Sequence, residues 1–174
     1  YAAIDEFDIS RSPSDVDLLN SNWIAYYKAI YRCNVLLSKM DQIEWDGDTA
    51  LRNTYESETK FIRAYLYFEM ARLWGSVPLL TVPTSENVPQ AAPEEIYKLI
   101  AEDLVFASTN LPVGAYNAVP NGRITKWAAK SLLGRVYLYY TGYYGKTDLA
   151  GIVTKTQALG HLEDVIAGSG HGLV

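Results

Sequence analysis

The sequence contains few of the residues that build disulfides, metal centres or nucleophilic active sites. Among its 174 residues there are one cysteine, Cys33, and two histidines, His161 and His171. A single cysteine cannot form an internal disulfide, and Cys33 lies among apolar residues, so we expect a buried, unreactive thiol. The histidines have no metal-ligand spacing and belong to no Ser-His or Cys-His arrangement. We therefore predict no metal site, no cofactor and no nucleophilic catalysis from these residues.

A basic tract, a glycine-rich phosphate loop and a long hydrophobic run are also absent. The net charge of −5 argues against a nucleic-acid partner. Charged residues, among them Arg63 and Arg135, interrupt the two most apolar stretches, so neither fits a membrane-spanning helix. What the chain does have is 49% hydrophobic residues and 14 tyrosines, which fits one globular domain with a substantial, aromatic-rich core.

Periodic apolar residues predict an all-α chain with no convincing strand. We expect a single helical domain over residues 1–174, with an irregular lead at 1–20 and a helical core at 21–174. Because the sequence opens with tyrosine and ends at the start of an apolar segment, we expect a fragment of a longer chain. The expected helices cover residues 22–40 after an Asn20 or Ser21 cap, 49–74, 93–111, 126–140 after a Thr125 cap, and 154–167.

The second expected helix contains the stretch ETKFIRAYLYFEMARLWGSVPLL, which is apolar on almost every face. We therefore expect it to be interior, with neighbours on several sides. Gly75 suits a helix end that needs positive φ, and Pro78 prevents the helix from resuming. The proline-rich segment 77–93 should then form an ordered loop that follows the surface.

Arg63 stands inside this apolar helix and needs an anionic partner, because a lone buried charge is very costly. Asp103, on the next expected helix, is the natural partner, and we predict a structural ion pair. The alternative is an arginine that lies half exposed at the edge of the helix.

The helices also show the spacing of stacked helix pairs, which predicts degenerate tetratricopeptide-like repeats with long inserted loops. In such repeats small residues let two helices approach closely, and large residues fill the space between pairs. An insertion at residues 141–152 would separate the helices of the last pair. The alternative is an irregular helical bundle. The matching residues are Leu133, Gly134 and Tyr137, then Ala158, Leu162 and Val165, and earlier Ile100, Leu104, Ala107 and Pro112.

One pattern, around the end of the second helix, is distinctive. It consists of Glu58, Phe61, Arg63-Ala64, Tyr67 and Leu73-Trp74-Gly75-x-Val77-Pro78-Leu79. Trp23-x3-Tyr27-x2-Ile30-x3-Asn34 precedes it, and the segments EEIYKLIAEDLVFASTNLP, GRITKWAAKSLLGRVYLYYTG and ALGHLEDVIAGSGHGLV follow it. In this order the segments resemble the helical core of the SusD/RagB family, over nearly the whole chain from residue 20.

The resemblance implies an outer-membrane nutrient-binding lipoprotein of Bacteroidetes-type bacteria, on the extracellular face. Such proteins form a lid on a SusC-like, TonB-dependent transporter and pass oligosaccharides, sometimes peptides, into it. Their helical repeats form the scaffold and the transporter-facing surface, and aromatic residues in loops form much of the ligand site. The family's lipid-bearing N-terminal cysteine does not occur here, so membrane attachment would depend on a lipid anchor outside this sequence.

A sugar site needs aromatic rings that stack on CH faces and polar neighbours that bind hydroxyls. Trp45, with Asp46 and Asp48 in the turn EWDGD, is the first candidate; the alternative is packing beneath the helix turn. Aromatic residues that fit core positions, such as Trp23 and Tyr27, are interpreted as packing. The further candidates are Tyr116 with Asn117, Tyr143 with Tyr144 as loop aromatics, and Asp8 with Arg11.

Three functions follow from these observations. The first is non-catalytic binding of an oligosaccharide and its delivery to a transporter. The second is a helical-repeat scaffold that binds another protein and no sugar, which a large exposed apolar surface would favour. The third is a glycan hydrolase, which would need two carboxyl groups facing each other across a cleft. The adjacent acids that could supply them are Glu56 and Glu58, Glu94 and Glu95, and Asp46 and Asp48, and we expect these to cap helices or face solvent.

Overall fold

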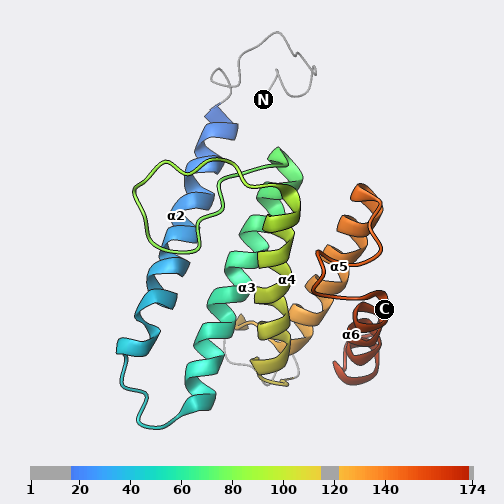
Figure 1. Cartoon of the computed structure of the whole chain (residues 1–174). Coiled ribbons are helices and arrows are strands. Elements are labelled where there is room, and N and C mark those ends of the chain that lie inside the picture. Colours follow the sequence, from blue (N-terminus) through green and yellow to red (C-terminus); the bar gives the residue numbers. More distant parts are fainter. Residues whose placement is uncertain (1–16, 115–121, 173–174) are drawn as a thin grey trace.

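A computed structural model describes residues 17–114 and 122–172, and in this part of the chain it is all-α, as predicted (Figure 1). Helices α2 to α5 lie side by side and run alternately down and up in the view, and α6 packs on α5. None of the described helices is both long and apolar enough to cross a membrane. The elements are α2 (Asp17–Lys39), the 3₁₀ helix η2 (Met40–Gln42), α3 (Thr49–Trp74), α4 (Pro93–Asn110), α5 (Lys126–Tyr144) and α6 (Lys155–Gly168).

Local capping explains why α3 begins and ends where the sequence predicts. The Asp48 carboxylate accepts a hydrogen bond from the Leu51 amide at 2.8 Å and so caps the first turn. At the other end Gly75 adopts φ 71°, a conformation that side chains disfavour, and the chain leaves the helix. Pro78 then pairs with Gln90 in an isolated bridge. The helix boundary and its sharp exit are both confirmed.

Two helix boundaries were predicted wrongly. Helix α2 begins at Asp17, so residues 17–20 are helical and not part of an irregular lead, and Asn20 and Ser21 lie within the helix. No glycine or proline interrupts this segment, so the helix extends beyond the first large aromatic residue. Helix α5 continues to Tyr144 because Gly142 costs only about 1 kcal/mol inside a helix, and the left-handed stop comes at Gly145.

The core forms where α3 meets α2 on one side and α4 on the other. Ala64, Tyr67 and Met70 of α3 are fully buried there. Helix α3 has neighbours on several sides, as predicted, but one of its faces has no helix against it, since Ile62 and Leu73 on that face are exposed by 42% and 55%. Apolar periodicity indicated that α3 is central, but it could not show that one face lacks a neighbour.

The close approach of α5 and α6 supports the predicted pairing of helices. A Cβ atom added to Gly134 would lie 2.5 Å from Cδ2 of Leu162, so only glycine allows the observed separation. Tyr137 and Ala158 are buried in the same helix pair. This is the arrangement expected of a small residue at a helix-pair contact.

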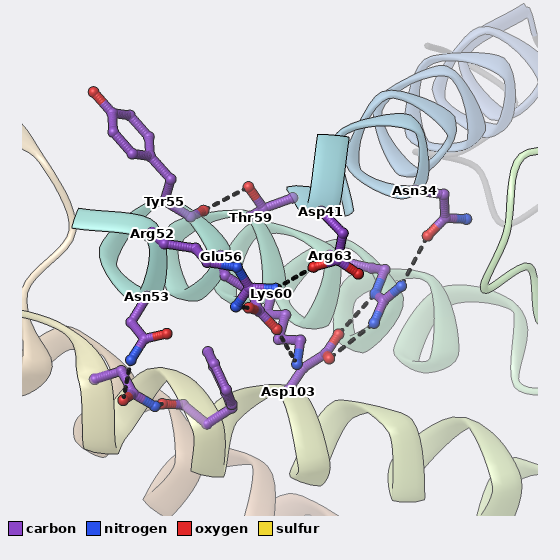
Figure 2. Close-up of polar contacts among 12 residues, drawn as sticks. Asn34, Asp41, Arg52, Asn53, Tyr55, Glu56, Thr59, Lys60, Arg63 and Asp103 are labelled. Atoms are coloured by element: carbon purple, nitrogen blue, oxygen red, sulfur yellow. Dashed lines mark hydrogen bonds and ion pairs between the residues drawn. The ribbon is translucent and has the colours of Figure 1, made fainter. Parts of the chain in front are cut away.

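A buried ion pair joins three helices and confirms the predicted partner of Arg63. Its Nε and Nη2 atoms donate to the two carboxylate oxygens of Asp103 at 2.8 and 2.9 Å (Figure 2). Its Nη1 atom donates to Oδ1 of Asn34 on α2 at 2.9 Å. Arg63 is only 6% exposed, which rules out the half-exposed alternative. Burial raises the pKa of the Asp103 carboxyl, and the hydrogen bonds from Arg63 counter that rise.

The same network fixes the loop between α3 and α4, which lies across α2 (Figure 1). Asn34 links the ion pair to this loop, because its Nδ2 atom donates to the Leu80 carbonyl at 2.8 Å. The Tyr67 hydroxyl donates to that carbonyl at 3.0 Å and accepts from the Leu80 amide at 2.7 Å. Burial raises the pKa of Tyr67 to about 12, so its hydroxyl keeps the proton that it donates. The proline-rich loop is therefore ordered and follows the surface, as predicted.

We expect Arg63→Leu to destabilise the fold by about 3–5 kcal/mol, because it leaves the Asp103 carboxylate buried without a partner. Urea unfolding followed by circular dichroism would measure the loss. The double variant Arg63→Leu/Asp103→Leu should recover part of it, since no lone charge then remains in the core.

Arg135→Leu provides the matched control. Arg135 on α5 is exposed and has no ion pair within the described part of the chain, so its replacement should change stability by less than about 0.5 kcal/mol. An unfolding midpoint of Arg63→Leu that equals the wild-type midpoint would contradict a structural role for the pair.

Candidate functional site

An open groove of about 650 Å³ lies between α2 and the loop that connects α3 to α4. We call it the α2–loop groove. Trp23, Tyr27 and Tyr31 lie four residues apart on α2, so their rings follow one side of the helix at intervals of about 6 Å. The full lining consists of Trp23, Ile24, Tyr27, Lys28, Tyr31, Arg32, Leu80 and Thr84.

The aromatic rings of the groove are held by contacts on their inner side. Trp23 packs edge-on against Trp74, with ring centroids 5.2 Å apart, and lies 4.9 Å from Tyr27. The Tyr27 hydroxyl donates to the Pro78 carbonyl at 2.8 Å. Burial raises the pKa of Tyr27, so this donor stays protonated. Tyr31 is half exposed and completes the row. A ligand would therefore meet the Trp23 and Tyr27 rings already in position.

A second, smaller pocket of about 230 Å³ adjoins the groove and shares Trp23, Tyr27 and Leu80 with it. The loop adds the polar side chains of Glu86 and Asn87 to this pocket. Rings on the helix side and hydrogen-bonding groups on the loop side form the combination that a flat polar ligand requires.

Another hollow, of about 370 Å³, lies between α3, α5 and the segment after α6. Phe61 and Trp127 contribute its aromatic surface. Its main charged group is already engaged, because Arg123 donates to both carboxylate oxygens of Glu58 at 2.7 and 2.5 Å. This hollow has no row of aromatic rings such as the one that lines the α2–loop groove.

The turn predicted as the first sugar site contains groups with structural contacts. The Trp45 indole N–H donates to the Met40 carbonyl at 3.0 Å, and the half-buried ring lies 5.9 Å from that of Tyr55. Asp48 caps α3, and Asp46 is exposed at a positive φ of 50°. These contacts favour the packing alternative for Trp45, while its role in sugar binding stays a prediction.

The other predicted residues do not gather with Trp45. Tyr143 and Tyr144 lie in the last turn of α5, so their assignment to a loop was wrong, although Tyr143 is 70% exposed. Tyr143 stacks on Tyr139 at 5.5 Å with an angle of 9° between the rings. Trp45 lies just before the start of α3. Trp74, which contacts Trp23 in the groove, is the last residue of the same helix, so the two sites lie at opposite ends of it. The predictions for Asp8, Arg11, Tyr116 and Asn117 fall outside the described residues.

The groove residues are the ones that the sequence interpretation missed. Trp23 and Tyr27 do pack against the core with one side, as expected, but the other side lines the groove. A signal was present in the sequence: three aromatic residues at four-residue intervals, each of the last two followed by a cation, Lys28 or Arg32. Periodicity alone could not show which side faces a loop.

The acids considered for hydrolysis have local partners. Glu56 forms ion pairs with Arg52 and Lys60, both at 2.9 Å. Glu95 accepts a hydrogen bond from the Ala92 amide at the start of α4, and Glu94 lies 3.6 Å from Lys146. Within residues 17–114 and 122–172, no three His, Cys, Asp or Glu side chains gather closely enough to hold a metal ion.

The chain is similar in sequence and in structure to known proteins. A SusD-like protein of Bacteroides ovatus is 27% identical over 132 residues, which cover 72% of this chain and 23% of the relative. A laminarin-binding SusD-like protein is 32% identical with a TM-score of 0.73, over 88% of this chain and 32% of its own. A structure solved with a xylogluco-oligosaccharide is 28% identical with a TM-score of 0.75, over 90% of this chain and 31% of its own.

The chain thus spans between about a quarter and a third of the length of these relatives. The family model that matches, SusD-like and described as starch-binding and associating with the outer membrane, covers residues 5–138. This is well over half of the sequence, and the segments that suggested the resemblance lie largely within it. The chain belongs to the SusD/RagB family.

Proposed function

We propose that this chain binds an oligosaccharide in the α2–loop groove, without converting it, and delivers it to a SusC-like, TonB-dependent transporter. The observation that carries the proposal is the row of Trp23, Tyr27 and Tyr31 opposite a polar loop, in a chain of this family. Sugar rings present CH faces that stack on such rings, while Thr84 and the neighbouring Asn87 can bind hydroxyls.

Two relatives support an oligosaccharide as the ligand class. One is named as laminarin-binding, and another was solved with a xylogluco-oligosaccharide. These are two different glycans, so the family fold accommodates more than one. The family's association with the outer membrane supports a location there. We propose the extracellular face, with attachment through a lipid anchor.

Binding without catalysis is supported by the environment of the acids. A hydrolase requires one carboxyl group that protonates the leaving oxygen and another that acts as base or nucleophile. Here Asp48 caps a helix, and Glu56, Glu58 and Glu94 are paired with cations. Within residues 17–114 and 122–172, neither these acids nor any other acid lines the α2–loop groove.

The proposal predicts that Tyr31→Ala weakens oligosaccharide binding about tenfold, because one stacking surface of the groove is lost. Isothermal titration of the chain with laminarihexaose and with a xyloglucan heptasaccharide would measure the effect. Tyr143→Ala, which removes another exposed tyrosine from a helix surface, should leave the Kd unchanged.

Trp45→Ala belongs in the same series because the sequence also predicts a sugar contact there. If Tyr31→Ala binds as wild type does, and Trp45→Ala or Tyr143→Ala abolishes binding, the site lies at those residues and not in the groove. If the wild-type chain binds none of these sugars, the proposed function itself fails for this chain.

The scaffold alternative is favoured by one specific observation. Ile62, Tyr65 and Leu73 are exposed along one side of α3, with Glu69 between them, and no described helix covers this side. Large apolar side chains that lie together on a surface are typical of protein interfaces. This side of α3 is therefore our candidate for a contact with another protein, the transporter included.

For this contact we expect Ile62→Ser/Leu73→Ser to abolish co-elution of the chain with a purified SusC-like transporter in size-exclusion chromatography. Sugar binding in the groove should persist, because neither residue lines it. Leu159→Ser/Ile166→Ser on α6 changes two other exposed apolar residues and should leave co-elution intact. Co-elution that survives in the α3 variant would contradict this assignment.

A further inference from the structure

We infer that the α2–loop groove selects an anionic oligosaccharide, one that carries uronate carboxylates or sulfate esters. The inference rests on the proposed function, because it names the class of sugar that the same groove would bind. It follows from the two cations in the groove and from what surrounds them.

Lys28 and Arg32 both line the groove and both are exposed. Among residues 17–114 and 122–172, neither has a carboxylate within ion-pair distance, although most other arginines there do: Arg52, Arg63, Arg72 and Arg123. Among the residues that the structure describes, no acid lines the groove, and Glu86 belongs to the adjoining pocket. The groove therefore presents two positive charges without local compensation.

This pair of cations has no evident benefit for the fold. Like charges four residues apart on a helix repel each other and destabilise it. Cations are also the minority in this chain, with 15 Lys and Arg against 20 Asp and Glu. Two uncompensated cations in one groove of an acidic protein create a local positive potential that attracts an anionic ligand.

The cations and the aromatic rings lie on the same turns of α2. Lys28 follows Tyr27 and Arg32 follows Tyr31, so the two cations form a second row, about 100° around the helix from these rings, and all four residues line the groove. A sugar stacked on the rings could direct a charged substituent toward this row of cations. The planar guanidinium of Arg32 suits carboxylate and sulfate oxygens because it can donate two parallel hydrogen bonds.

An oligosaccharide fits this site better than an acidic peptide does. Charge alone would suit either ligand, but the row of three rings offers flat apolar surfaces at regular intervals, which successive sugar units can use. The Thr84 hydroxyl on the loop side adds a partner for a sugar hydroxyl. The experiment must therefore distinguish binding of an acidic peptide from binding of a charged sugar.

The test is isothermal titration of the full 174-residue chain with two matched pairs of sugars. The first pair is hexagalacturonate and its fully methyl-esterified, neutral form; the second is sulfated and unsulfated laminarihexaose. We expect the charged member of at least one pair to bind at least tenfold more tightly than its neutral counterpart. Added sodium chloride should reduce this ratio, because the two cations are exposed to solvent.

The variant Lys28→Gln/Arg32→Gln should abolish the preference, so that the charged and the neutral member of a pair bind with similar Kd values. Lys98→Gln/Arg135→Gln makes the same change of charge at exposed positions of α4 and α5 and should keep the preference. Circular dichroism would confirm that both variants fold, as expected for exposed helix residues replaced by glutamine.

The possible failures are distinguishable. If charged and neutral sugars bind equally, or the preference survives in Lys28→Gln/Arg32→Gln, the inference is overturned and the proposed function stands. If no sugar of either pair binds, and the xyloglucan heptasaccharide also fails to bind, the proposed function is wrong and the inference with it. If hexaglutamate binds as tightly as the charged sugars and competes with them, the groove recognises charge alone and the commitment to a sugar is wrong.

Discussion

The buried ion pair between Arg63 and Asp103 is the interaction on which the rest of the structure depends. It places a charged group from α3 and another from α4 in the core, where either one alone would be strongly unfavourable. The pair therefore requires that these helices meet in one register. Asn34 extends this requirement to α2, and through the Leu80 carbonyl to the loop. One polar network in an otherwise apolar interior thus fixes three helices together (Figure 2), and its hydrogen bond to Leu80 fixes the loop as well.

The candidate site follows from this network because the loop that it fixes forms one wall of the groove. Leu80, whose backbone accepts from Asn34 and exchanges two hydrogen bonds with Tyr67, also lines the groove with its side chain. Tyr27 holds the loop at Pro78 and presents its ring to the groove. Rings that are fixed before a ligand arrives lose little conformational freedom on binding, which favours affinity. The residues that stabilise the fold and those that would bind a sugar are therefore close neighbours.

Much of the fold could be predicted from the sequence because its signals are local. Caps and breakers such as Asp48, Gly75 and Pro93 fix helix ends within a few residues, and a charge in an apolar helix indicates a buried partner.

The site could not be predicted in the same way. Whether the outer sides of Trp23 and Tyr27 face solvent depends on where the loop lies, which is a property of the tertiary structure. The exposed face of α3 escaped prediction for the same reason, since periodicity shows which residues are apolar and not what covers them.

The central claim is that the α2–loop groove receives a sugar on its row of aromatic rings. A crystal structure of the chain with a bound oligosaccharide tests it most directly. The account predicts sugar rings stacked along Trp23, Tyr27 and Tyr31, with hydrogen bonds to the loop and the loop in the position seen here. An oligosaccharide bound at Trp45 or Tyr143, with the groove empty, would contradict it.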